Sequence, residues 1–121
     1  LLLCLITALV SCNNDDITID ENNLLLGSWI NPQYENNKTT FKRAKSLKED
    51  GYGISFLAND IFIERHSGWC GTPPLIFGDF TGLWNENESN ININIDNGIS
   101  GMTSFSWKII SLDGETLVIE R

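Results

Sequence analysis

The stretch Asn90-Ile91-Asn92-Ile93-Asn94-Ile95-Asp96 decides the fold class of this chain. Polar and apolar residues alternate strictly along it. Successive side chains of a β-strand point to opposite faces of the sheet, so the isoleucines lie on one face and the polar groups on the other. The stretch therefore predicts a half-buried strand with Ile91, Ile93 and Ile95 facing a core.

The segment that follows repeats this pattern. Residues 103–109 place Phe105, Trp107 and Ile109 on one face, and Asp113-Gly114 leads into a further strand pattern over residues 115–120. An Asp-Gly pair between two strand patterns is typical of a tight β-turn. We expect a closing hairpin here.

Strand patterns also precede the Ile-rich stretch. Residues 52–58 and 61–65 predict a hairpin around Asn59-Asp60, because Asn and Asp tolerate the left-handed backbone of tight turns. Residues 78–84 predict a strand with one apolar face, made of Phe80, Gly82 and Trp84.

Two segments nearer the start complete the pattern. Residues 39–44 favour a strand, although apolar residues at a spacing of three, Phe41, Ala44 and Leu47, also fit a short helix. Residues 24–30 predict the first strand, which we expect to end at a turn at Asn31-Pro32. About eight short strands joined mostly by tight turns predict a small all-β domain, an antiparallel up-and-down β-barrel or a strongly curled sheet.

Length and charge limit the domain count and the partners. The 121 residues suit a single domain. Asp and Glu number 16 against 8 Lys and Arg, which gives a formal net charge of -8. Because an acidic surface repels phosphate backbones, nucleic acid is not an expected partner.

The beginning of the chain is typical of a secreted, lipid-anchored protein. Residues 1–10 are almost entirely apolar, as in the core of a signal peptide that is truncated at its start. Leu9-Val10-Ser11-Cys12 resembles the bacterial lipobox, and this resemblance implies a lipid anchor on Cys12. The alternative is an ordinary thiol behind an ordinary signal peptide. We expect a signal peptide over residues 1–11, the lipidated Cys and an acidic tether over 12–23, and the barrel domain over 24–121.

A family resemblance rests on the Gly27-Ser28-Trp29 opening, the meander of strands and the closing pattern of residues 107–114. Together they resemble the small lipocalin-like (calycin-type) lipoproteins of Gram-negative bacteria. The resemblance implies a barrel in which Trp29 plugs one end and Gly27 allows a close backbone approach. It also implies a place in the cell envelope, at the outer membrane and facing either the periplasm or the cell surface.

The leading functional hypothesis is a non-enzymatic barrel, anchored to the membrane through Cys12, that binds a small apolar or amphipathic molecule. Its expected binding residues are aromatic side chains at the open end of the barrel, Trp29, Trp84, Phe105 and Trp107. The strands are shorter than those of full-size lipocalins, and four Trp and six Phe can fill much of such an interior.

The alternative is a protein-interaction or inhibitory module that uses the loop Gly68-Trp69-Cys70-Gly71-Thr72-Pro73-Pro74. Its contact candidates are Trp69, Cys70, Pro73 and Pro74. We expect the Cys70 thiol to be shielded, because an exposed thiol is a liability in an oxidising compartment.

Catalytic chemistry finds little support in the sequence. A Cys70–His66 dyad has no third orienting group, and a thioredoxin-like site lacks its second Cys because position 73 is Pro. A metal site on Cys70 and His66 needs two more ligands, for which Glu64 and Asp79 are the only suggestions. We therefore predict no enzymatic activity, no metal and no cofactor.

Overall fold

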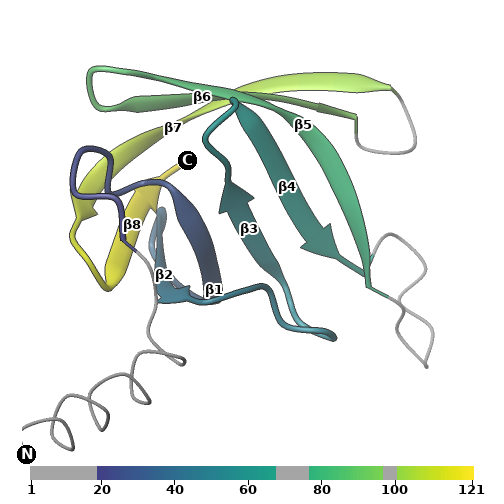
Figure 1. The fold of residues 1–121 in the computed structure, drawn as a ribbon, viewed down its shortest axis with the longest axis horizontal. Coiled ribbons are helices and arrows are strands. Elements are labelled where there is room, and N and C mark those ends of the chain that lie inside the picture. The colour runs from purple at the N-terminus through teal and green to yellow at the C-terminus, as the bar shows by residue number, and fades with distance from the viewer. Residues whose placement is uncertain (1–18, 68–76, 97–100) are drawn as a thin grey trace, which may run out of the picture.

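A computed structural model describes residues 19–67, 77–96 and 101–121, and these form an all-β barrel (Figure 1). Eight strands close into one antiparallel sheet. They are β1 (Gly27–Glu35), β2 (Lys38–Ala44), β3 (Gly53–Phe56), β4 (Ile61–His66), β5 (Gly78–Asn87), β6 (Asn90–Asp96), β7 (Met102–Leu112) and β8 (Thr116–Glu120). The predicted fold class and approximate strand number are confirmed, and residues 39–44 lie in a strand rather than a helix.

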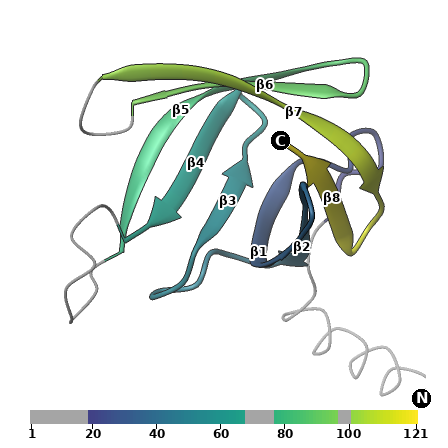
Figure 2. The same ribbon diagram turned by 180° about the vertical axis from the view of Figure 1, so that it is seen from behind.

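The strand order is up-and-down over most of the barrel. From β3 to β8 each strand pairs with the next one along the chain. The first hairpin then closes the sheet, with β2 against β8 and β1 between β2 and β3. Figures 1 and 2 show β6 and β7 along one side of the barrel, with β1, β2 and β8 grouped beside β3.

The alternation seen in the sequence becomes the inner face of the sheet. Ile93 on β6 lies between Trp84 on β5 and Phe105 on β7 in the register, and Ile91 faces Trp107. All three isoleucines of β6 are at most 2% exposed. The buried apolar core comprises Leu25, Trp29, Phe41, Ile54, Phe56, Phe62, Trp84, Ile91, Ile93, Ile95, Trp107, Leu117 and Ile119.

The expected turn at Asn31-Pro32 is wrong, because β1 continues through these residues to Glu35. The register with β2 shifts between Ile30 and Gln33, so two residues of β1 face Phe41 alone. This is a β-bulge, and Asn31 supplies the left-handed conformation it needs at φ 53°. Proline lacks an N–H to donate to the ladder, so a bulge is one of the few places in a sheet that accept it. The turn itself follows Glu35, where Asn36 has φ 59°.

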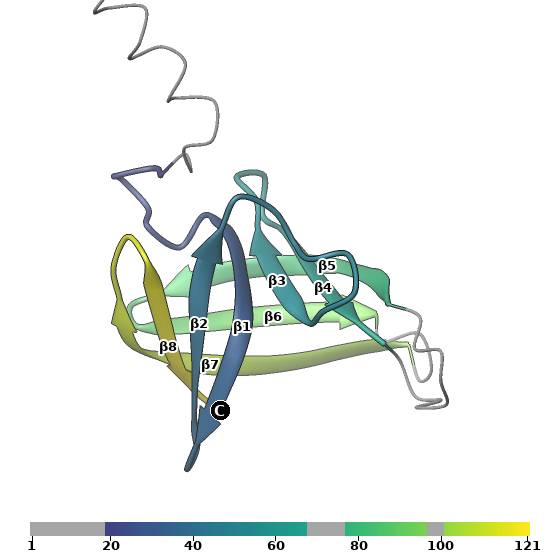
Figure 3. The same cartoon turned by 90° about the horizontal axis from the view of Figure 1, so that it is seen from below.

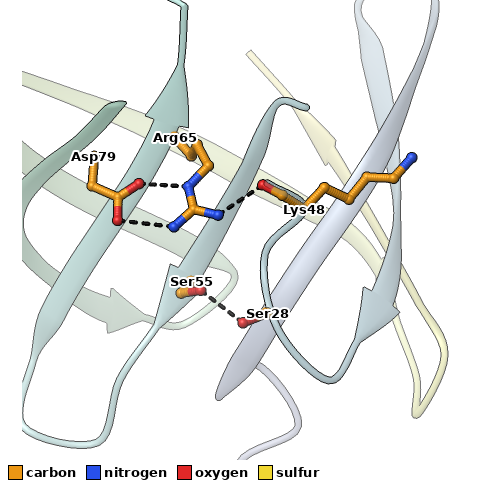
Figure 4. Close-up of polar contacts among 5 residues, drawn as sticks. All are labelled: Ser28, Lys48, Ser55, Arg65 and Asp79. Carbon is orange, nitrogen blue, oxygen red and sulfur yellow. Dashed lines mark hydrogen bonds and ion pairs between the residues drawn. The ribbon is translucent and has the colours of Figure 1, made fainter. Parts of the chain in front are cut away.

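The connection from β2 to β3 crosses the outside of β1, as Figure 3 shows. It is held there by Arg65 on β4, whose guanidinium donates to the Lys48 carbonyl at 2.7 Å and to both carboxylate oxygens of Asp79 on β5 (Figure 4). Nearby, the hydroxyls of Ser28 and Ser55 lie 2.8 Å apart and tie β1 to β3. These contacts fix the one place where the chain leaves the up-and-down order.

Among the residues that the structure describes, there is no helix long and apolar enough to cross a membrane.

Candidate functional site at the open end of the barrel

One end of the barrel is plugged by Trp29, which has no exposed surface. Its indole nitrogen donates to the Leu25 carbonyl at 3.0 Å, and the Arg43 guanidinium lies 4.3 Å from the ring centroid. Gly27 has φ 131°, and a Cβ at this position would lie 2.6 Å from Nη1 of Arg43. Trp29 is thus fixed inside the barrel beside a glycine whose missing Cβ makes room for the Arg43 side chain.

Arg43 completes this closed end. Its guanidinium donates to three backbone carbonyls, those of Gly114, Leu26 and Leu24. Burial lowers the pKa of Arg43, and the nearby Asp113 carboxylate acts in the opposite direction. The Arg43 side chain therefore has a structural role, because its guanidinium donates hydrogen bonds to the protein backbone.

Aromatic side chains fill the middle of the barrel. Phe56 packs against Phe62 and Trp84 with ring centroids 5.3 and 5.1 Å apart, and Phe62 meets Trp107 at 6.1 Å. The indole nitrogen of Trp84 donates to the Leu57 carbonyl at 3.0 Å. This part of the interior is therefore a packed aromatic core.

The opposite end holds a pocket of about 460 Å³. Its apolar lining comes from β6 and β7, where Trp107 and Ile95 are almost fully buried and Phe105 is half-buried. Its polar lining residues are Glu64, Thr103, Ser106 and Arg121. Because inner-face positions of three strands and the end of a fourth converge here, the pocket lies in the mouth of the barrel.

On the polar side of this mouth, a short hydrogen bond joins Tyr52 to Glu64. The Tyr52 hydroxyl donates to Oε2 of Glu64 at 2.5 Å. Burial raises the pKa of Tyr52 far above its ordinary value, and the adjacent Glu64 carboxylate raises it further, whereas Arg121 acts to lower it. Tyr52 therefore stays protonated at neutral pH and keeps its proton directed at Glu64.

A second charged group, the Arg121 guanidinium, also lines the pocket. The Arg121 guanidinium is placed over the Trp107 ring, 5.1 Å from its centroid. On the β4–β5 side, the His66 ring stacks on Phe80 at 4.2 Å with an interplanar angle of 7°. The mouth thus combines aromatic surface with one carboxylate and one guanidinium.

The structure divides the four aromatic residues that the sequence suggested for ligand binding. Phe105 and Trp107 line the mouth pocket, whereas Trp29 and Trp84 are buried in the core and do not line it. The loop candidates Trp69, Cys70, Pro73 and Pro74 and the lipidation site Cys12 lie outside the described residues.

Sequence reasoning missed the polar half of the site. Glu64 was considered only as a metal ligand, although its spacing of two from Phe62 already places it on the inner face of the hairpin. Tyr52 lies in the predicted strand 52–58, and its spacing of two from Ile54 already places it on the inner face. Arg121 gave no such signal, because it lies just outside a strand. Its meeting with Glu64 depends on closure of the barrel.

The residues suggested for a metal site are separated by the sheet. Glu64 faces inward, whereas Asp79 alternates with inward-facing Phe80 and pairs with Arg65 on the outside at 2.6 Å. That pairing lowers the pKa of Asp79. Within the described part of the chain, no three His, Cys, Asp or Glu residues form a group that could hold a metal ion.

Comparison with protein-family models, with curated proteins and with solved structures finds no match to this chain. The resemblance to lipocalin-like lipoproteins therefore stays a prediction, and the functional argument rests on the geometry of the barrel.

Proposed function

We propose that this protein is a lipocalin-like lipoprotein that binds a small apolar or amphipathic molecule in the mouth of its barrel and performs no catalysis. The observation that carries the proposal is the pocket of about 460 Å³ at one end of an otherwise packed interior. Its size lies within the roughly 300–1,000 Å³ that is typical of small-molecule sites. Its lining also has the usual composition, a mainly apolar surface with a few polar groups that fix orientation.

The packing of the barrel supports a preformed site. Trp107 is held from below by Phe62 and from the side by Phe105, with centroids 6.1 and 5.4 Å apart. Because the Phe105 and Trp107 side chains are already ordered by this packing, they lose little conformational entropy when a ligand binds against them. Binding affinity is then available from the apolar surface that the ligand removes from water.

Anchorage through Cys12 is the second part of the proposal, with the protein at the outer membrane of a Gram-negative cell envelope. Several acyl chains on one residue give durable attachment, since each buried CH₂ contributes roughly 0.8 kcal/mol. The intact protein should partition into detergent, and Cys12→Ala should abolish this partition and change its mobility on a denaturing gel. A wild-type protein that stays in the aqueous phase would rule the anchor out.

Native mass spectrometry of protein purified from its host tests the binding function. We expect a co-purifying small molecule. Two neighbouring variants on β7 make a matched pair, because Thr103 lines the pocket and Ser104 faces outward. Thr103→Phe should displace the bound mass and Ser104→Phe should retain it. Equal occupancy in both variants would show that the molecule binds elsewhere.

A further inference from the structure

The mouth pocket carries two opposite charges on different walls. Glu64 comes from β4, and Arg121 follows β8 and lies against Trp107 of β7. Both line the same pocket. Both also act on the Tyr52 hydroxyl, the carboxylate raising the pKa of Tyr52 and the guanidinium lowering it. The pocket is therefore dipolar, with a carboxylate and a guanidinium beside the aromatic surface of Phe105 and Trp107.

Glu64 limits what the pocket can hold. Among the described residues, its hydrogen-bond partner is the Tyr52 hydroxyl on Oε2. An ionised carboxylate has about four acceptor positions, so the group retains capacity toward the pocket. A purely apolar ligand would displace water from this half-buried carboxylate without offering a hydrogen bond in its place. Leaving a charged group without such a partner costs free energy. The ligand needs a donor at this wall, and a cationic donor fits best.

Arg121, in contrast, requires a ligand group that accepts hydrogen bonds. Its guanidinium offers five donors and no acceptor. Within residues 19–67, 77–96 and 101–121, the ion pair that the structure shows joins Arg65 to Asp79 on the outer surface, and Arg121 has no ion-pair partner in these ranges. Stacked on Trp107, the planar group is presented at the pocket and suits a carboxylate, which it can bind through two parallel hydrogen bonds.

We propose that the ligand is a compact zwitterionic amphiphile, with a cationic donor on Glu64, an anionic acceptor on Arg121 and an apolar or aromatic body on Phe105 and Trp107. This inference rests on the proposed function and narrows it, because it selects an amphipathic ligand over an apolar one. The pocket volume of about 460 Å³ suits a small molecule rather than a long lipid chain.

Four probes with one naphthyl body and different end groups test this inference by isothermal titration calorimetry at pH 7. They are naphthylalanine, naphthylethylamine, naphthylpropionate and naphthylpropanol, which are zwitterionic, cationic, anionic and neutral. We expect naphthylalanine to bind tightest, by about tenfold over either singly charged probe, because a charge-assisted hydrogen bond is worth about that factor.

Variants that remove one charge each show which charged group of the probe contacts Glu64 and which contacts Arg121. Glu64→Gln, which can still accept from Tyr52, should weaken naphthylalanine and naphthylethylamine by about tenfold and leave naphthylpropionate unchanged. Arg121→Gln should weaken naphthylalanine and naphthylpropionate only. Exposed residues elsewhere give charge-matched controls, Glu86→Gln and Lys108→Gln, which should leave all affinities unchanged.

Two results would overturn the inference, and they differ in what they mean for the proposed function. If naphthylpropanol binds as tightly as naphthylalanine, the pocket is an apolar site and the proposed function stands without the charge requirement. If no probe binds, the inference fails. Should native mass spectrometry also reveal no bound molecule, the proposed function fails with it.

Discussion

Replacing Arg43 by Met should destabilise the barrel severely. The change keeps most of the apolar stem and removes the guanidinium, which covers Trp29 at 4.3 Å. It leaves the carbonyls of Gly114, Leu26 and Leu24 without their donor. Arg43 is 5% exposed, so little water is present to replace these bonds.

The magnitude follows from the contacts. A hydrogen bond to a charged group contributes roughly 1.5–3 kcal/mol, and a partly buried cation–π contact about 1–2 kcal/mol. Simple addition gives an upper limit, because contacts made by one group are not additive and part of the charge desolvation cost is recovered. We expect a loss of about 3–5 kcal/mol, a large share of the roughly 5–15 kcal/mol by which domains are stable.

Urea unfolding of the full chain, followed by tryptophan emission, measures this loss. Lys42→Met is the matched control, since Lys42 is the preceding residue on β2 and is exposed, and its effect should stay within about 0.5 kcal/mol. Arg43→Lys keeps the charge without the planar donor fork and should fall between the two. If Arg43→Met and Lys42→Met unfold at the same urea concentration, the closed end does not depend on this guanidinium.

Three smaller perturbations probe other parts of the barrel. Gly82→Ala should cost about 1–3 kcal/mol or more in urea unfolding, because its Cβ would lie 2.3 Å from a β6 carbonyl, whereas Gly78→Ala, with open space around it, should be neutral. The pKa of Tyr52 is raised on folding, so the protonated hydroxyl contributes to folding stability below about pH 10, and this contribution is lost as the pH rises further. The wild type should therefore lose more stability than Tyr52→Phe between pH 9 and 11 in urea unfolding. The pKa of Asp79 is lowered by Arg65, so the stability lost in Asp79→Asn, under about 1 kcal/mol for an exposed pair, should be fully present at pH 7 and should shrink as the pH falls below about 4.

The strands were predictable because local alternation and burial agree along most of the chain. Residues 90–96 alternate in the sequence and in the observed exposure, and the Asp113 turn forms as expected, with its carboxylate accepting from the backbone N–H groups of Glu115 and Thr116. Asn31-Pro32 misled the prediction because the same residue types serve turns and bulges. Only the register against β2 distinguishes the two.

The position of β1 in the sheet and the polar half of the site could not be predicted from local sequence patterns. Placing β1 between β2 and β3 depends on pairings that form only when the sheet closes. Closure also brings together Tyr52, Glu64 and Arg121, which are distant in sequence. The aromatic half was partly accessible, because Phe105 and Trp107 lie on the inward face of a clear strand pattern.

Two arginines, Arg43 and Arg121, lie over tryptophan rings, and their contacts differ. The difference explains why we assign a structural role to the first and a ligand-binding role to the second. Arg43 over Trp29 directs its donors at three carbonyls of the same chain, so its hydrogen-bonding capacity is used by the fold. Arg121 makes the same kind of ring contact with Trp107, yet it is exposed and lines a pocket that also contains Glu64. A barrel selected for stability alone would gain more by filling that mouth with apolar side chains, since exchanging separated charges for packed hydrophobic groups is often neutral or favourable. Retaining a carboxylate and a guanidinium around preformed aromatic surface is the arrangement that a polar-ended ligand requires.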